Sequence, residues 1–222
     1  MARSLDTREQ LLEVAERLFA ERGYGATSAR QITIEADANI AAVHYHFGGK
    51  PQLLQAVLTR RLEPVNRERL RRLDALERAG GAAPPDVDAI LTAFLAPALR
   101  LGARADNPVA RVSRLLGRIH VEAPEGIREA VLAPFEAVQR RFVEALAKTL
   151  PDVPQSEIFL RLRFAMGVMI HIVTGIQEAQ SLREFEPDRA ESDLLQPVVS
   201  FLTAGFSAPA TRLPGGGGDA VR

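Results

Sequence analysis

The chain has 222 residues, carries 28 basic and 28 acidic side chains, and is 46% hydrophobic. Zero net charge argues against a protein that coats nucleic acid without sequence preference, and the lack of cysteine excludes disulfides and Cys-ligated zinc. The N-terminal MARSLDTREQ is no secretory signal, and the longest apolar run, 164–173, covers only about half a membrane span. We therefore expect a soluble, cytoplasmic protein that does not enter membranes.

Helical periodicity runs through most of the chain, and no segment convincingly predicts a strand. In the first predicted helix Leu11, Val14 and Leu18 recur at spacings of three and four residues. This spacing is typical of an amphipathic helix with one buried face. Asp6 or Thr7 can cap its start.

Two short helices are predicted next. Ser28 is a good N-cap for a helix over 29–36, and Asn39 can cap another over 40–47, after a tight turn at 37–39. Two short helices joined by a tight turn, with the second facing outward, are typical of a helix-turn-helix.

The second of these short helices has the side chains that a DNA-reading helix needs. Ile40, Val43 and Phe47 recur at i, i+3 and i+7 and predict one buried stripe. The side chains left facing outward or sideways are Ala41, Ala42, His44, Tyr45 and His46. Small alanines let a helix approach a groove floor, and tyrosine and histidine can donate to phosphates or base edges. The pattern favours DNA binding over an ordinary core helix pair.

A metal site and a phosphate loop are the competing interpretations of this segment. His44 and His46 are two residues apart, so they point to different sides of a helix and lack the i, i+4 spacing of a zinc helix. The GGK that ends at Lys50 lacks the earlier glycine and the following Ser or Thr of a P-loop. We therefore expect no metal and no cofactor.

The rest of the chain is also predicted to be helical. A long helix is expected from Pro51 to about Glu77, with Pro64 as a kink site, followed by a linker-like stretch at 79–88. Further helices are expected over 86–103, 107–121, 125–149, 154–181 and 188–207, and a disordered Pro- and Gly-rich tail over 209–222.

Residues 7–57 resemble the DNA-binding domain of TetR-family transcriptional regulators. The matching features are LFAERGY at the end of the first helix, TS before the second, and YHFGGK followed by LL. The resemblance implies an all-α homodimer of about nine helices per chain. Its helix-turn-helix domain, with three helices, would occupy 1–52, and its ligand-binding and dimerisation domain would occupy 53–208. Ala38 departs from the glycine that is usual in the family's turn, and Thr33 from a common alanine.

The resemblance also implies a set of contacts with double-stranded operator DNA. The phosphate contacts that it implies come from Thr27, Ser28, Tyr45, His46 and Lys50. The base contacts come from the outward residues Ala41, Ala42 and His44, and Asn39, which caps the same helix, belongs to the same DNA-binding set. A helix N-terminus, such as the one that Ser28 opens, suits an anion on physical grounds as well.

The C-terminal half is expected to sense a ligand and to form the dimer. The resemblance implies that the last two long predicted helices, 154–181 and 188–207, make a four-helix dimer interface. Short matches such as SRLLG at 113–117 and LRFAMG at 162–167 resemble the branch of the family that responds to fatty acids or acyl-coenzyme A esters. The candidate effector contacts are cations for an acidic head group and methionines for an apolar chain: Arg114, Arg118, His120, Met166, Met169 and His171.

The function that these features favour is a ligand-responsive, DNA-binding transcriptional regulator. We expect a repressor that binds a palindromic operator as a dimer and is released by a small lipophilic effector, such as a fatty acid or acyl-CoA. A regulator that senses an aromatic or drug-like compound is one alternative, and a helical interaction module without DNA binding is another. An enzyme is not expected, because no nucleophile elbow, metal cluster or nucleotide loop is present in the sequence.

Overall fold

The computed structural model describes residues 6–102, 115, 125–174 and 194–211. This part of the chain forms eight helices and contains no strand, so the all-α prediction is confirmed. None of these helices is both long and apolar enough to span a membrane.

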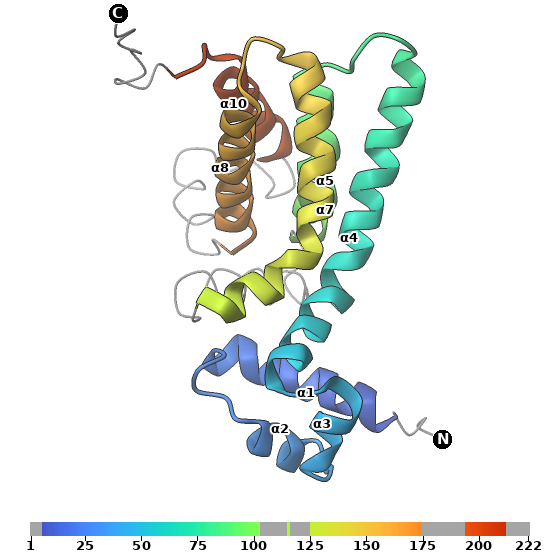
Figure 1. Ribbon diagram of the computed structural model, residues 1–222, viewed down its shortest axis with the longest axis vertical. Coiled ribbons are helices and arrows are strands. Elements are labelled where there is room, and N and C mark those ends of the chain that lie inside the picture. Colours follow the sequence, from blue (N-terminus) through green and yellow to red (C-terminus); the bar gives the residue numbers. More distant parts are fainter. Residues whose placement is uncertain (1–5, 103–114, 116–124, 175–193, 212–222) are drawn as a thin grey trace, which may run out of the picture.

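The N-terminal helices form one end of the molecule (Figure 1). Helices α1 (Thr7–Arg22) and α3 (Ala41–Phe47) pack against the first half of α4 (Lys50–Gly80), and α2 (Ala29–Glu35) packs on α1 and α3. Helices α2 and α3 begin and end within one residue of the predicted bounds. Their inward side chains belong to a hydrophobic cluster, the N-terminal core, formed by Leu11, Leu12, Ala15, Leu18, Phe19, Ile32, Ala36, Val43, Leu53, Leu54, Val57, Leu58 and Leu115.

In the turn between α2 and α3, the residue with a left-handed backbone conformation is Asp37. The glycine that is usual in the family would lie one position later, at Ala38. Asp37 has a φ of 49°, whereas Ala38 is not among the residues of positive φ in the described part of the chain. Aspartate adopts the left-handed region more readily than most residues. The Ala38 N–H donates to the Thr33 carbonyl oxygen at 2.9 Å. The chain therefore makes a tight turn here without glycine.

The C-terminal helices pack along the second half of α4. Helices α5 (Val87–Gly102) and α7 (Glu125–Thr149) contact α4 directly. Helices α8 (Gln155–Thr174) and α10 (Leu195–Ser207) contact α5, and α8 also contacts α7 and α10. Helices α5 and α7 thus lie between α4 on one side and α8 and α10 on the other (Figure 1).

Most predicted helices of this half coincide with described ones. Phe94 and Phe142 meet edge to face in its core, with ring centroids 5.0 Å apart. The predicted helix over 107–121 lies outside the described residues apart from Leu115, as do 175–181 and 188–193 of the last two predicted helices. Helix α4 continues through Pro64 to Gly80 and is longer than expected.

Helix α4 joins the two halves of the molecule, and Leu115, which follows α4 in the sequence, adds a contact between them. Leu115 is fully buried and belongs to the N-terminal core, although it comes from the C-terminal half of the sequence. On the other side, Arg61 donates from Nε to the buried carboxylate of Glu16 at 2.8 Å, and Arg60 pairs with Glu9. These contacts tie α1 to α4, so α1 and α4 are expected to move together.

A buried ion pair on α8 holds the end of α10. Arg161 donates to Glu157 at 2.6 Å and to the carbonyl oxygens of Phe206 and Ala208 at 2.7 and 2.8 Å. The Thr211 N–H donates to Glu157 at 2.9 Å. The sequence assigned Thr211 to a disordered tail, and that expectation does not hold at this residue; 212–222 lie outside the described residues.

Candidate DNA-binding surface and effector site

Helix α3 presents an outward face at the end of the molecule farthest from α10 (Figure 1). Tyr45 is 85% exposed, and Ala41 and His44 are exposed on the same short helix. Val43 is its one fully buried side chain. An outward helix anchored by so small a core contact leaves most of its side chains free to meet another molecule.

The predicted buried stripe of α3 is wrong at its first member. Ile40 is 52% exposed, while Val43 is fully buried and Phe47 is half-buried. Ile40 lies at the N-cap position, where the chain enters from an exposed turn, before the first helical residue Ala41. It therefore adds an aliphatic side chain to the outward surface instead of the core.

Two of the predicted site residues bond to the starts of helices, Ser28 as the N-cap of α2 and Asn39 from one position before the N-cap of α3. The Asn39 Oδ1 accepts from the Ala41 N–H at 2.9 Å and so satisfies an N–H that the helix itself cannot. The Ser28 hydroxyl accepts from the Gln31 N–H at 3.2 Å, and Gln31 Oε1 accepts from the Ser28 N–H at 2.8 Å. This reciprocal pair is a capping box. Both caps are exposed, so they can shape the helix starts and still face a ligand.

We expect Ser28→Ala to lower the free energy of unfolding by about 0.5–2 kcal/mol, because the capping box loses its side-chain acceptor. Ser28→Asn is the matched control, since asparagine also caps well. Thermal or urea unfolding of the two variants measures the difference. Equal stability of the alanine and asparagine variants would contradict the capping role.

Thr27 does not present its hydroxyl to the surface. The residue is buried, and its Oγ1 lies 2.8 Å from the Gly23 carbonyl oxygen and 3.2 Å from that of Leu18. The hydroxyl therefore joins the end of α1 to the start of α2. The phosphate contact expected from this side chain is not available in this structure.

Lys50 and His46 are half-buried beside aromatic rings. The Lys50 Nζ lies 4.0 Å from the centroid of the Tyr24 ring, and burial lowers the pKa of Lys50. His46 lies between Tyr45 and Phe47, with ring centroids 4.9 and 6.2 Å apart. Tyr45 and His46 therefore lie together, and the Lys50 ammonium lies over the Tyr24 ring.

Arg30 is a candidate that the sequence did not single out. It is exposed in the first turn of α2, close to the Ser28 cap, and forms no ion pair with any residue that the structure describes. By contrast, Arg17 and Arg22 both pair with Glu35. The signal that could have found Arg30 is its place two residues after the cap, at the N-terminus of a helix.

We expect Arg30→Ala to weaken binding to operator and to random DNA alike, because a phosphate contact carries no sequence information. Because the dimer carries Arg30 twice, the slope of log K against log salt should become shallower by about 2, roughly 1 for each lost phosphate contact. Arg22→Ala is the matched control and should change the slope less, since Glu35 already neutralises Arg22. Fluorescence anisotropy over a salt series measures both, and an unchanged slope in Arg30→Ala would rule out the contact.

The predicted effector residues are only partly brought together. Met169 is buried in the core, Met166 is half-buried, and His171 is exposed on the same helix, α8. The Gln139 Nε2 donates to the Met166 sulfur at 3.3 Å. The remaining candidates lie outside the described residues: Arg114, Arg118 and His120.

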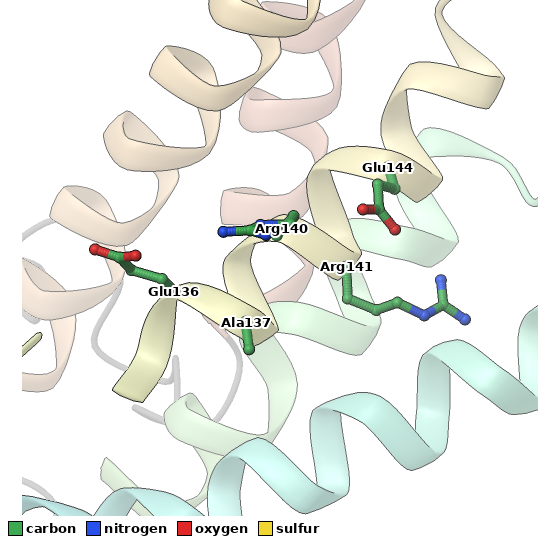
Figure 2. A pocket seen from close by; sticks show the side chains of 5 residues that line it. All are labelled: Glu136, Ala137, Arg140, Arg141 and Glu144. Carbon is green, nitrogen blue, oxygen red and sulfur yellow. The ribbon is translucent and has the colours of Figure 1, made fainter. Parts of the chain in front are cut away.

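A shallow depression of about 300 Å³ lies on α7 (Figure 2). It is lined by Glu136, Ala137, Arg140, Arg141 and Glu144. Four of these five side chains are charged, and Arg141 pairs with Glu77 and Asp74 of α4. The depression is therefore too polar to hold a lipophilic effector, and residues 103–114, 116–124 and 175–193 of the C-terminal half are not described.

Helices α8 and α10 contact each other, and both expose large apolar side chains. Phe164 is 60% and Phe201 is 71% exposed, and Phe159 and Leu160 are also exposed. A Cβ added at Gly167 would meet no atom within 4 Å. We call Phe159, Leu160, Phe164 and Phe201 the α8/α10 apolar face.

Comparison with known proteins defines the class of this molecule. Residues 11–57 match the family described as bacterial regulatory proteins, tetR family, and 92–205 match the tetracyclin repressor-like, C-terminal domain. The second match spans just over half of the chain, so the chain belongs to the TetR family, as the sequence resemblance predicted. It is a DNA-binding transcriptional regulator with an N-terminal helix-turn-helix. Regulators of this family bind operator DNA and act as dimers.

Individual relatives are similar over a part of the chain. The nicotine-responsive transcriptional repressor HdnoR of Paenarthrobacter nicotinovorans is 36% identical over 74 residues, 33% of this chain and 38% of that protein. The transcriptional regulator Mb3439c of Mycobacterium bovis is 50% identical over 48 residues, 22% of this chain and 26% of that one. This chain thus matches about two fifths of the length of HdnoR and about a quarter of the length of Mb3439c.

A solved structure shows the same fold over almost the whole chain. The fatty acid degradation regulator FadR from Bacillus halodurans has a TM-score of 0.57 over 92% of this chain and 98% of that one, with 17% sequence identity. At that identity the likeness extends to the fold alone.

Proposed function

We propose that the protein is a homodimeric repressor that binds a palindromic operator through α3 and leaves it when a lipophilic effector binds. In this proposal residues 1–52 bind DNA, and 53–208 bind the effector and form the dimer. The observation that carries the DNA contact is the outward face of α3, where Tyr45 is 85% exposed beside Ala41 and His44.

The chemistry of this face fits a major groove. The small side chain of Ala41 lets the helix backbone approach the bases, and alanine or the exposed aliphatic Ile40 can touch a thymine methyl. Tyr45 can donate to a phosphate, and the exposed His44 can donate to a base edge. Ser28 adds the N-terminus of α2 to the same surface, where partial positive charge favours an anion.

A second copy of the chain fits the α8/α10 apolar face. Exposed apolar side chains this large on two adjoining helices are unusual for a soluble surface unless a partner covers them. A two-fold dimer buries the same face of each copy at once. It would also place two α3 helices for successive major grooves, with half-sites roughly 34–36 Å apart or more.

The link between ligand and DNA would run through α4 and Leu115. Leu115 is buried in the N-terminal core, and α4 is continuous from Lys50 to Gly80. A ligand that binds one arrangement of the dimer better than the other shifts the population, and so changes the spacing of the two α3 helices.

A fatty acid or acyl-CoA ester is the effector class that we propose. The support is the abundance of apolar helical surface in the C-terminal half, with the adaptable Met166 and Met169 within it, and the short sequence matches to the lipid-responsive branch. These observations favour an elongated apolar ligand over a sugar-like one.

The experiment is a titration of the operator complex. Full-length protein would select its operator from a random DNA pool, and fatty acids and acyl-CoA esters of increasing chain length would then be added. We expect micromolar concentrations of an acyl compound to release the DNA. The same compound should raise the melting temperature of the protein without DNA. Release by an aromatic drug or a sugar-like metabolite, but by no acyl compound, would overturn the effector class.

A further inference from the structure

Arg69 is a cation in the interior of the C-terminal half. It is only 8% exposed, at the place where α4, α5 and α8 meet. Its Nε donates to the Phe94 carbonyl oxygen at 2.8 Å, Nη1 to the Asn66 Oδ1 at 3.0 Å, and Nη2 to the Met169 sulfur at 3.1 Å. Its guanidinium carbon lies 4.3 Å from the centroid of the Phe94 ring.

None of these partners carries a negative charge. Arg69 forms no ion pair with a residue in the described ranges, and its hydrogen bonds to Phe94, Asn66 and Met169 use three of the five N–H donors of a guanidinium. Arg161 is buried to the same degree, yet it pairs with Glu157. Burial lowers the pKa of Arg69 to about 10. Within the described part of the chain Arg69 is therefore a buried cation without a counter-charge, an arrangement that costs free energy unless a partner compensates it.

A purely structural role accounts for part of this arrangement. Pro97 has no N–H, and its ring crowds the preceding turn of α5. The bond from Arg69 to the Phe94 carbonyl lies in that turn and ties α4 to α5. A neutral donor could make this bond to the carbonyl, however, and among the described contacts of Arg69 only the stacking on the Phe94 ring uses its charge.

We infer that Arg69 is the receptor for the carboxylate of an acidic lipophile bound inside the C-terminal half. The inference rests on the proposed function and narrows the effector to a free acid. A guanidinium binds a carboxylate through two parallel N–H bonds. The carboxylate would replace the Met169 sulfur, a weak acceptor on a flexible side chain that can move aside.

The residues around Arg69 favour a ligand that has one carboxylate and an otherwise apolar structure. The Phe94 ring and the Met169 side chain offer contacts to a hydrocarbon chain. One buried cation can balance one carboxylate, whereas the phosphates of a coenzyme A ester would need several cations and water. Arg69 lies on α4, which continues to the N-terminal core, so a ligand here acts directly on the helix that carries α3.

The test compares each acid with its own methyl ester. Saturated fatty acids of several lengths, an aryl-alkanoic acid, their methyl esters and the coenzyme A thioesters are titrated into full-length protein by calorimetry and thermal shift. We expect at least one acid to bind about tenfold or more tightly than its ester and its thioester. Arg69→Met should abolish that preference, while Arg67→Met, at an exposed position of the same helix, should keep it.

Three results would overturn the site: acids and esters that bind alike, a panel from which no acid binds, or an acid preference that survives in Arg69→Met. Should Arg69→Met not fold, the ester comparison on the unchanged protein decides, together with Arg69→Lys, which keeps the charge but loses the paired donors. Operator binding is measured on the same preparations. A protein that binds acids but no operator contradicts the proposed function and leaves the carboxylate site standing.

Discussion

Phe164→Glu combined with Phe201→Glu should convert the dimer into a monomer and lower operator affinity by about 100-fold or more. Both side chains lie on the α8/α10 apolar face, at 60% and 71% exposure. In a two-fold dimer each substitution occurs twice, so four carboxylates would be buried at the interface without partners. Because both rings are largely exposed in the single chain, the fold of the monomer should change little.

Ala75→Glu is the control for added charge, since Ala75 is an exposed residue of α4 on another surface. Analytical ultracentrifugation gives the mass of each variant, and anisotropy gives the operator affinity. A double variant that stays dimeric and binds operator normally would show that the chains meet elsewhere.

Tyr45→Ala should weaken operator binding by about 1–3 kcal/mol and leave the melting temperature unchanged. The side chain is 85% exposed, so its removal costs little folding free energy, but it lies at the centre of the outward face of α3. Val43→Ala, two residues earlier, is the matched contrast. It removes buried methyl groups from the N-terminal core and should lower the free energy of unfolding by about 1–3 kcal/mol.

Together the two variants distinguish the effect of a surface side chain on DNA binding from the effect of a core side chain on stability, within the same helix. Anisotropy with the selected operator and thermal unfolding are measured for both proteins. If Tyr45→Ala binds operator normally, or if it unfolds as Val43→Ala is expected to, the outward face has been assigned wrongly.

The helices could be predicted from the sequence because their signals are local. Apolar spacing and helix caps fix where a helix starts and which way it faces, and the Ser28 capping box and the Asn39 cap appear in the structure as the residue types suggest. Ile40 was misplaced because periodicity assumes that a residue is already within the helix, and Ile40 precedes it.

The site residues were harder to predict because their roles depend on tertiary contacts. Thr27 directly precedes the N-cap Ser28, a position that suggests an exposed side chain. In the structure its hydroxyl donates to the carbonyl oxygen of Leu18, nine positions earlier. Arg69 belongs to an arginine-rich segment, 60–72, whose composition is typical of a solvent-exposed helix surface. The packing of α5 and α8 against α4 buries it, and local sequence does not reveal that packing. Arg161 reaches Ala208 across 47 positions, a separation at which no local pattern gives a signal.

The most direct test of operator recognition is the stoichiometry of the complex on a selected site. Full-length protein is titrated against the selected DNA, intact or with one half-site scrambled, and the mass of the complex is measured. We predict two chains on an intact palindrome, protection of both half-sites, and loss of affinity when either half is scrambled. One chain bound to one half-site with undiminished affinity, or no preference over competitor DNA, would contradict the account.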